Sequence, residues 1–328
     1  MKDLRNILIF VFVVASIPLW SDSGVLLNFV MTALYACLLA QAWNVLGGFG
    51  GQFSFGHALF FGTGAYVQAI AQMQCGLNAW VALPLGMAFA AGVGAFVGAL
   101  SFRYGLKGSY FALVTLAFAE VFRIAATSVP FTGAGVGLML PLRESASNMQ
   151  FGSRAGFVWL MLGLVTLALL VTAWLRHSRF GACLQAVRDN EDAARAVGVN
   201  PFQVKLVATV LSAALMGAAG AFYVQVFQYI DPGIAYGPHT SVEALVGAIV
   251  GGMGTLWGPV LGALSLHILA DLTRNLFGQL PGINMVIYGS VLVLIVMFLP
   301  RGIAGLGQFT WWQGLRSAAK SVSRKELP

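Results

Sequence analysis

Long apolar runs recur along almost the whole chain, separated by short polar connections. Ten runs approach or exceed the roughly 20 residues that an α-helix needs to cross a bilayer. They cover residues 7–20, 25–46, 53–73, 80–102, 110–129, 157–175, 202–230, 241–257, 259–276 and 283–299. The first run is short, and glycines interrupt the third and the eighth, which are candidates for re-entrant segments. The pattern predicts an all-α polytopic membrane protein with about eight to ten transmembrane helices.

One long polar stretch interrupts this pattern between the sixth and seventh runs. Residues 176–205 read RHSRFGACLQAVRDNEDAARAVGVNPFQVK. Phe180 and Leu184 recur at helical spacing, and Asn190 followed by Glu191 suits the start of a second helix. The stretch therefore predicts two short amphipathic helices that form a docking surface for a soluble partner. A solvated connector is the alternative.

Composition and charge narrow the class of protein. Apolar residues make up 59% of the chain and charged residues only 9%, against about 25% charged in a soluble domain, so most of the surface must face lipid. The net charge of +7 does not predict nucleic-acid binding, because the basic residues lie in loops and at the tail without interleaved aromatics. If the N-terminus is cytoplasmic, ten spans place most of the lysines and arginines on the cytoplasmic side of the membrane. The exceptions are Arg123, Arg143, Arg154 and Arg274.

This charge distribution predicts the organisation of the chain. We expect one transmembrane permease domain over residues 1–302, with the polar loop 176–205 and a basic tail 303–328 on the cytoplasmic side. Both termini would then be cytoplasmic. The loop at residues 130–156 is the largest on the outer side.

Glycine-rich stretches provide candidates for a translocation path or gate. Residues 47–66 and 247–261 are rich in glycine, and irregular backbone is tolerated at membrane depth only when it is buried in protein or lines a cavity. Tight helix packing is the alternative. Both stretches contain a GGxG string, which is either an internal repeat or a coincidence. The glycines and polar residues of these stretches are candidates for the translocation path or gate, and so is the acidic residue Glu120, which lies inside another span. The full set is Gly50, Gln52, Ser54, His57, Glu120, Gly252 and Gly254.

Glu120 has two interpretations. It lies three residues before Arg123, so the two side chains can pair on one helix face. Ionisable residues inside membrane spans often mark a substrate or ion path. A structural pair near the outer interface is the other interpretation.

Catalytic patterns are absent from the sequence. No glycine-rich loop ending in Lys-Ser or Lys-Thr occurs, so the chain has no Walker A site for ATP, and no HExxH string occurs. The three cysteines and four histidines are scattered without metal-ligand spacing. We therefore expect no metal, no cofactor and no enzymatic activity.

Four stretches, in order, resemble the branched-chain amino acid ABC transporter permease family. They are GGFGGQFSFGHALFFGTGAY (47–66), GLKGSYFALVTLAFAEVFR (105–123), SRFGACLQAVRDNEDAARAVGVNPFQVK (178–205) and GGMGTLWGPVLGA (251–263). The second stretch is similar to the longer, LivM-type, of the two permeases that pair in this family, and urea and amide permeases are close relatives. The resemblance extends over residues 28–302.

The resemblance implies a partner set and a coupling site. It implies that the chain forms half of the translocation pathway of an importer in the bacterial inner membrane. A second homologous permease would form the other half. Two cytoplasmic ATPases would bind the ATP, and a periplasmic binding protein would deliver leucine, isoleucine, valine or a related small ligand. The E-x-A-A-x-x-x-G core of the family's coupling signature is present, whereas its downstream I-x-L-P part is absent. The expected coupling residues are Phe180, Leu184, Arg188, Glu191, Ala193, Ala194 and Gly198.

Two other functions stay open on the sequence. An ion-coupled secondary transporter would need a buried acidic relay, for which Glu120 is the one plausible member. A structural membrane subunit without a pore would show no ligand-dependent effect in an uptake assay. The mechanism that we expect is alternating access driven by the partner ATPases.

Overall fold

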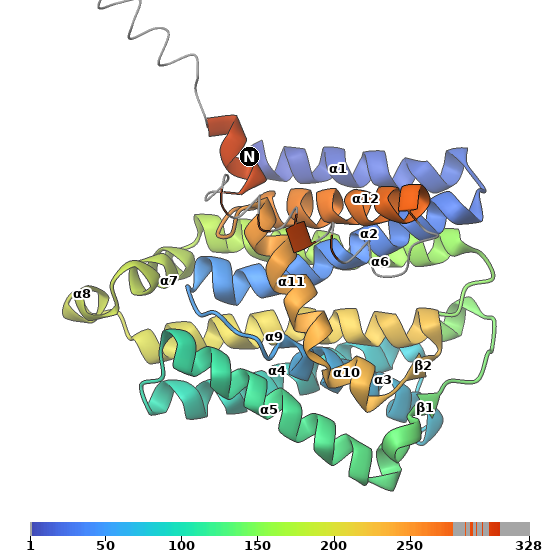
Figure 1. The fold of residues 1–328 in the computed structure, drawn as a ribbon, viewed down its shortest axis with the longest axis horizontal. Coiled ribbons are helices and arrows are strands. Elements are labelled where there is room, and N and C mark those ends of the chain that lie inside the picture. Colours follow the sequence, from blue (N-terminus) through green and yellow to red (C-terminus); the bar gives the residue numbers. More distant parts are fainter. Residues whose placement is uncertain are drawn as a thin grey trace, which may run out of the picture.

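The computed structural model describes residues 2–277, 286, 289–290, 293, 297 and 302–308. Long helices lie side by side along one direction, and short helices project from one end (Figure 1). The last predicted run, residues 283–299, lies almost entirely outside the described residues, as does the basic tail beyond Gln308. These two parts of the sequence analysis stay predictions.

Six helices in the described part of the chain are long and apolar enough to cross a membrane. They are α1 (Lys2–Trp20), α2 (Gly24–Trp43), α4 (Ala79–Arg103), α5 (Gly108–Ser128), α6 (Arg154–His177) and α9 (Pro201–Phe227). A π-helical turn, η1 (Asn44–Phe49), continues α2. The predicted all-α membrane fold is confirmed, and the protein is a multi-pass membrane protein.

Three further helices account for the remaining apolar runs in the described region. They are α3 (His57–Met73), α11 (Pro238–Gly251) and α12 (Gly258–Phe277). α3 has 17 residues and α11 has 14, which is short for a full crossing. In Figure 1, α11 runs across the direction of the long helices. The total of eight to ten transmembrane helices stays a prediction.

Small residues bring α3, α4 and α9 into close contact. A Cβ atom on Gly64 would lie 2.1 Å from the carbonyl oxygen of Gly217, and one on Gly217 would lie 2.5 Å from the Cβ of Ala90. A second group contains α2, α6, α11 and α12, and α2 packs it against α9. Close backbone approach of this kind holds helices together in lipid, where burial of apolar side chains from water provides no force.

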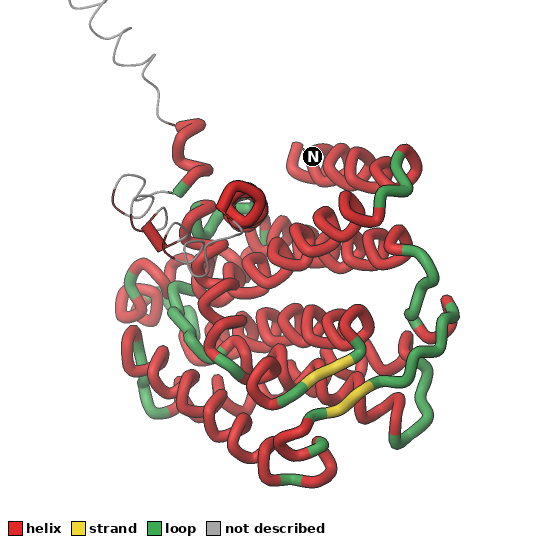
Figure 2. Tube along the Cα trace, turned by 45° about the vertical axis from the view of Figure 1, so that its right-hand side comes forward, coloured by secondary structure: helices red, strands yellow, loops and turns green. Residues whose placement is uncertain are grey.

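The two ends of the bundle carry different structures. The short helices α7 (Arg179–Asp189) and α8 (Glu191–Ala196) project at one end, and the strands β1 (Leu138–Met139) and β2 (Tyr229–Ile230) lie at the other (Figure 1). The strands pair antiparallel and fasten the predicted outer loop to the end of α9 (Figure 2). A short helix, α10 (Pro232–Tyr236), follows β2.

The N-terminus lies at the same end as α7 and α8. The Asp3 carboxylate lies 2.8 Å from Nε2 of His177 and 3.2 Å from Nη1 of Arg176, at the last turn of α6. This contact agrees with the prediction that the N-terminus and the polar loop share one side of the membrane.

Candidate functional site

The polar loop forms the two short helices that the sequence predicts. The Ser178 hydroxyl caps α7 by accepting from the Gly181 amide, and the Asn190 side chain caps α8 by accepting from the Asp192 and Ala193 amides. Asn200 caps α9, with Pro201 as its first residue. These side chains satisfy amides at helix starts that have no partner within the helix, which is why the local sequence fixes the boundaries. The prediction of two helices and of the Asn190 cap is confirmed.

One face of α7 and α8 is buried in the bundle. Leu184 is fully buried and Ala194 nearly so. Phe180 is half-buried and stacks on Trp174 of α6, with ring centroids 5.7 Å apart. A Cβ atom on Gly181 would overlap the Leu175 carbonyl, so α7 lies directly against the end of α6. Three of the seven expected coupling residues therefore attach the helices to their own chain.

The exposed surface of the two helices mixes small residues with charged ones such as Asp189, Asp192 and Arg195. Ala193 and Gly198, which the sequence analysis named, lie on it, and Gly198 has a φ of +89°. The sequence analysis missed the other exposed uncharged members, which are Ala182, Gln185, Ala186, Ala196 and Val197. A helical wheel would have found Ala182 and Ala186, because residues two positions from Leu184 point away from it. We call the seven residues the alanine face.

Arg188 reaches from α7 into the bundle. Its Nη1 donates a hydrogen bond of 2.7 Å to the carbonyl of Gly48. Its side chain also passes close to two other glycines, since a Cβ atom would lie 2.3 Å from Arg188 Cγ if placed on Gly51 and 2.9 Å from Nη1 if placed on Gly254. Gly51 and Gly254 have positive φ angles of 64° and 76°. Helix α7 thus contacts both glycine-rich stretches directly.

The two GGxG strings lie side by side. A Cβ atom on Gly48 would lie 2.5 Å from the Gly254 nitrogen. The Asn44 side chain joins the strings, because its Oδ1 accepts from the Gly254 amide at 2.7 Å and its Nδ2 donates to the Thr255 carbonyl at 3.0 Å. Gln41 adds a third bond by donating to the Leu256 carbonyl at 2.7 Å. These amides satisfy backbone groups that the irregular segment leaves free in a membrane.

Asn44 and Gln41 were missed in the sequence analysis. Both are fully buried in α2 and η1, inside the second apolar run. A polar amide within such a run was the available signal, because it is costly in lipid without a partner. Gly50 and Gly252 belong to the same junction, where Gly50 lies against Leu184 and Gly252 has a φ of +112°. We call this contact between residues 44–51 and 251–256 the glycine junction.

Three further predicted path residues, Gln52, Ser54 and His57, are buried close to the glycine junction, whereas Glu120 is exposed on α5. The Gln52 side chain donates to the Gly50 carbonyl at 3.2 Å, and the Ser54 hydroxyl accepts from the Gly56 amide. His57 Nε2 lies 2.9 Å from the Ser212 hydroxyl of α9. The helix α3 is continuous from His57 onward, so the irregular backbone in this stretch ends before it. A pathway role for these residues stays a prediction.

Glu191 anchors α8 to the bundle. Its carboxylate lies 2.6 Å from Nζ of Lys205 in α9 and 3.2 Å from Nζ of Lys107 before α5, and it also pairs with Arg195. Burial acts to raise the pKa of Glu191, but the hydrogen bonds and charges of the two lysines outweigh it and hold the pKa below its ordinary value. The acidic residue of the coupling signature therefore makes an intramolecular contact.

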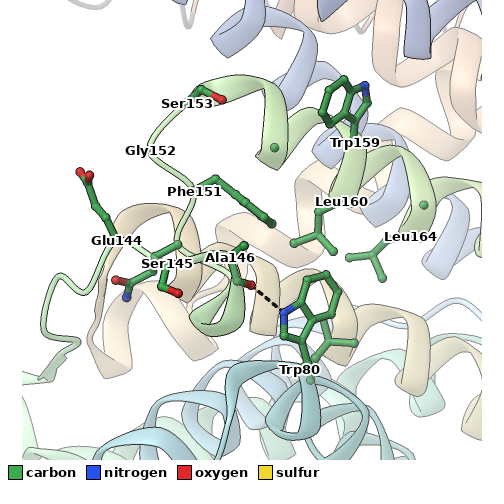
Figure 3. Close-up of a pocket in the computed structure, with 14 residues that line it drawn as sticks. Trp80, Glu144, Ser145, Ala146, Phe151, Gly152, Ser153, Trp159, Leu160 and Leu164 are labelled. Carbon is green, nitrogen blue, oxygen red and sulfur yellow. Dashed lines mark hydrogen bonds between the residues drawn. The ribbon is translucent and has the colours of Figure 1, made fainter.

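A hollow of about 840 Å³ lies at the opposite end of the bundle, between α4, α6 and the loop that joins α5 to α6 (Figure 3). Trp80 borders it and donates a hydrogen bond of 2.8 Å to the Ala146 carbonyl. Leu160 and Leu164 form part of its apolar wall, and Glu144 lies at its polar edge. The hollow is separate from the glycine junction. Among the described residues, no group of three or more His, Cys, Asp and Glu is placed to hold a metal ion.

Apolar spans, a projecting helix pair and a backbone junction linked to that pair define a multi-pass membrane protein whose short helices at one end contact irregular backbone among the long helices. The family model of the branched-chain amino acid transport system permease component matches residues 25–297. The chain belongs to this family of ABC importer permeases. As a permease component, it is a non-catalytic transmembrane subunit without a cofactor.

Individual relatives agree with this assignment. The chain is 30% identical over 298 residues to the LivM permease protein of the high-affinity branched-chain amino acid transport system of Salmonella typhimurium, with 83% of this chain and 68% of LivM covered. It is 24% identical to LivH of the same organism, with 82% of this chain and 90% of LivH covered. It is also 28% identical to the ribose import permease RbsC of Escherichia coli, with 72% of this chain and 73% of RbsC covered. No solved structure matches the chain.

Proposed function

We propose that the chain forms one half of the translocation pathway of an importer for branched-chain amino acids in the bacterial inner membrane. The other half is a second homologous permease, since both LivM and LivH are named as permeases of such a system. Two cytoplasmic ATPases and a periplasmic binding protein complete the assembly. The observation that carries the proposal is the bond from Arg188 to Gly48, which connects a projecting helix to irregular backbone inside the membrane.

The alanine face is the docking surface for the ATPase. It is exposed and lined by small side chains, and Val197 at its tip is 79% exposed. An exposed apolar ridge of this size fits a groove on a soluble protein. Phe180, Leu184 and Ala194 attach α7 and α8 to the bundle from behind. Closure of the ATPases therefore moves the helices as one unit and transmits the movement through Arg188 to the glycine junction.

The opposite end receives the binding protein. The loop between α5 and α6 lies at the end away from α7 and α8 (Figure 1), and the hollow lies beside this loop (Figure 3). With α7, α8 and both termini in the cytoplasm, this end faces the periplasm. Cargo released there enters the pathway, which alternates between outward and inward access.

Docking is tested by placing a charge on the alanine face. Ala193→Arg is expected to abolish co-purification of the ATPase while leaving membrane insertion intact. Ala146→Arg, an exposed alanine at the opposite end, is the matched control and is expected to retain the ATPase. Normal ATPase binding and ATP-driven uptake by Ala193→Arg would overturn the docking role of this face.

The cargo is tested with the complete transporter in proteoliposomes. ATP-driven uptake is expected for L-leucine, L-isoleucine and L-valine, and not for urea, acetamide or ribose. Uptake of one of the latter without uptake of L-leucine would reject branched-chain amino acids and leave the importer assignment standing.

A further inference from the structure

Helix α5 presents two different faces. Phe111, Thr115 and Ala119 are buried against the bundle. The opposite face is uncovered in the described part of the chain, and we call it the open face of α5. Its large members are Tyr110, Leu113, Leu116, Glu120, Val121 and Ile124.

An ion pair lies on this apolar open face. The Arg123 guanidinium donates two hydrogen bonds to the Glu120 carboxylate, of 2.8 Å from Nε and 2.5 Å from Nη2. The Glu120 side chain is 49% exposed and the Arg123 side chain 36% exposed. Leu116 and Ile124 lie one helical turn before and after Glu120, so aliphatic side chains flank the pair.

Glu120 lies well inside the span, and Arg123 lies five residues from its end. At 1.5 Å per residue, Glu120 is about 18 Å from the start of α5 and about 12 Å from its end. The Arg123 side chain turns back toward Glu120, away from the nearer end of the helix. It therefore does not reach for the membrane surface, as a snorkelling arginine does.

The position is unusual among the six apolar helices. In the other five, every Lys, Arg, Asp or Glu lies within four residues of an end of the span, whereas Glu120 lies eight residues from the nearer end of α5. Holding two charges against hydrocarbon costs several kcal/mol per ion, and charged side chains in membranes face water-filled cavities or other protein. Lipid is therefore an unfavourable neighbour for the open face of α5.

The chemistry of this face matches a small zwitterion with an aliphatic side chain. A guanidinium group binds a carboxylate through two parallel hydrogen bonds, and a carboxylate accepts hydrogen bonds from an ammonium group. Leu113, Leu116 and Ile124 supply apolar surface beside the pair. The pair already bonds to itself, so it stays satisfied when no cargo is present.

We propose that the open face of α5 lines a water-filled seam with the second permease, where Arg123 and Glu120 bind the carboxylate and ammonium groups of an amino acid in transit. This inference rests on the proposed function, and it adds the residues that contact the cargo. The second permease supplies the facing wall, which residues 2–277 of this chain do not provide on that side.

Water access to the face is the first test. In a chain without Cys37, Cys75 and Cys183, Leu116→Cys is assembled into the complete transporter in proteoliposomes and treated with a charged, water-soluble thiol reagent. Phe89→Cys, at an exposed position in the middle of α4, is the matched control for a lipid-facing site. Leu116→Cys is expected to react at least about tenfold faster, because the reagent does not enter lipid. Equally slow reaction at both sites would overturn the proposal.

Reversing the pair is the second test. The double variant Glu120→Arg with Arg123→Glu keeps an ion pair on the face but exchanges the two charges. L-leucine uptake per ATP hydrolysed is expected to fall about tenfold or more, since the cargo then meets like charges. The apparent KM, which the binding protein sets, stays unchanged. If the double variant takes up L-leucine at the wild-type level, the pair has only a structural role and the proposal is overturned.

A neutral double variant and the wild-type complex separate a failure of this inference from a failure of the proposed function. Glu120→Gln with Arg123→Gln removes both charges at nearly constant shape and is expected to assemble and to lose uptake per ATP in the same way. Full uptake by this neutral variant would also overturn the cargo contact. If the wild-type complex assembles and hydrolyses ATP but takes up no L-leucine, the proposed function fails instead.

Discussion

Arg188 on α7 donates a hydrogen bond of 2.7 Å from Nη1 to the backbone carbonyl of Gly48 inside the bundle. The same guanidinium contacts Gly254, which comes 206 positions later than Gly48 along the chain. One side chain therefore connects a projecting helix to two irregular backbone segments that already lie against each other.

Arg188→Ala is expected to reduce ATP-driven uptake about tenfold, because a charge-assisted hydrogen bond is worth about 1.5–3 kcal/mol. Binding of the ATPase is expected to persist, since the alanine face is unchanged. Arg179→Ala, an exposed arginine on the same helix, is the control. Uptake and co-purification are measured together, and a loss of ATPase binding in Arg188→Ala alone would show that this side chain serves docking.

Asn44→Leu is expected to destabilise the protein by about 2–4 kcal/mol. The change keeps the number and branching of the side-chain heavy atoms but leaves the Gly254 amide and the Thr255 carbonyl without their partner, and each buried group left unpaired costs about 1–3 kcal/mol. Asn28→Leu, at an exposed position on the same helix, is the matched control. Thermal unfolding in detergent compares them, and equal midpoints would contradict a structural role for Asn44.

Glu191→Gln is expected to loosen α8 by about 3 kcal/mol at neutral pH, because it leaves the Lys205 ammonium buried without a counter-charge. Lys205 is only 4% exposed at its side chain, so water does not replace the carboxylate. Protease sensitivity of the α7–α8 region measures the effect. Asp192→Asn, at an exposed neighbouring position, is expected to change little.

The pH dependence of the same region follows from the lowered pKa of Glu191. A carboxyl group whose pKa is lower in the folded than in the unfolded protein stabilises the fold above the unfolded value, here about 4.5, and loses this contribution as the pH falls through the folded value. The wild-type region is therefore expected to loosen more than the Glu191→Gln variant when the pH drops from 7 to below 4.5. If the two proteins loosen equally, the lowered pKa of Glu191 does not stabilise the folded region.

Native cysteines test the orientation. Cys75 is exposed after α3, where the neighbouring Gln74 side chain donates to the Phe131 carbonyl of the proposed outer loop. Cys183 lies on α7 at the other end. In intact cells stripped of the outer membrane, a membrane-impermeant maleimide is expected to label Cys75, whereas Cys183 reacts only after lysis. Labelling of Cys183 in intact cells would reverse the proposed topology.

Local patterns in the sequence were sufficient for much of the fold. The spacing of Phe180 and Leu184 and the cap residue Asn190 depend on neighbours a few positions away, so α7 and α8 could be predicted. The same pattern could not tell a docking face from an attachment face. The resemblance to the permease family selected Leu184 and Ala194 for coupling, and the bundle buries both.

By itself, the sequence determined a polytopic helical membrane protein with two short helices in a polar loop and no ATP site of its own, because hydrophobic length, helix caps and motif spacing are local properties. Only the tertiary structure decided that Arg188 meets Gly48 and Gly254 and that Asn44 joins the two glycine strings. It also showed that the Glu120–Arg123 pair lies on a face of α5 that the described residues leave exposed. These relationships depend on how closely helices pack, and glycine permits but does not specify a contact between segments about 200 residues apart.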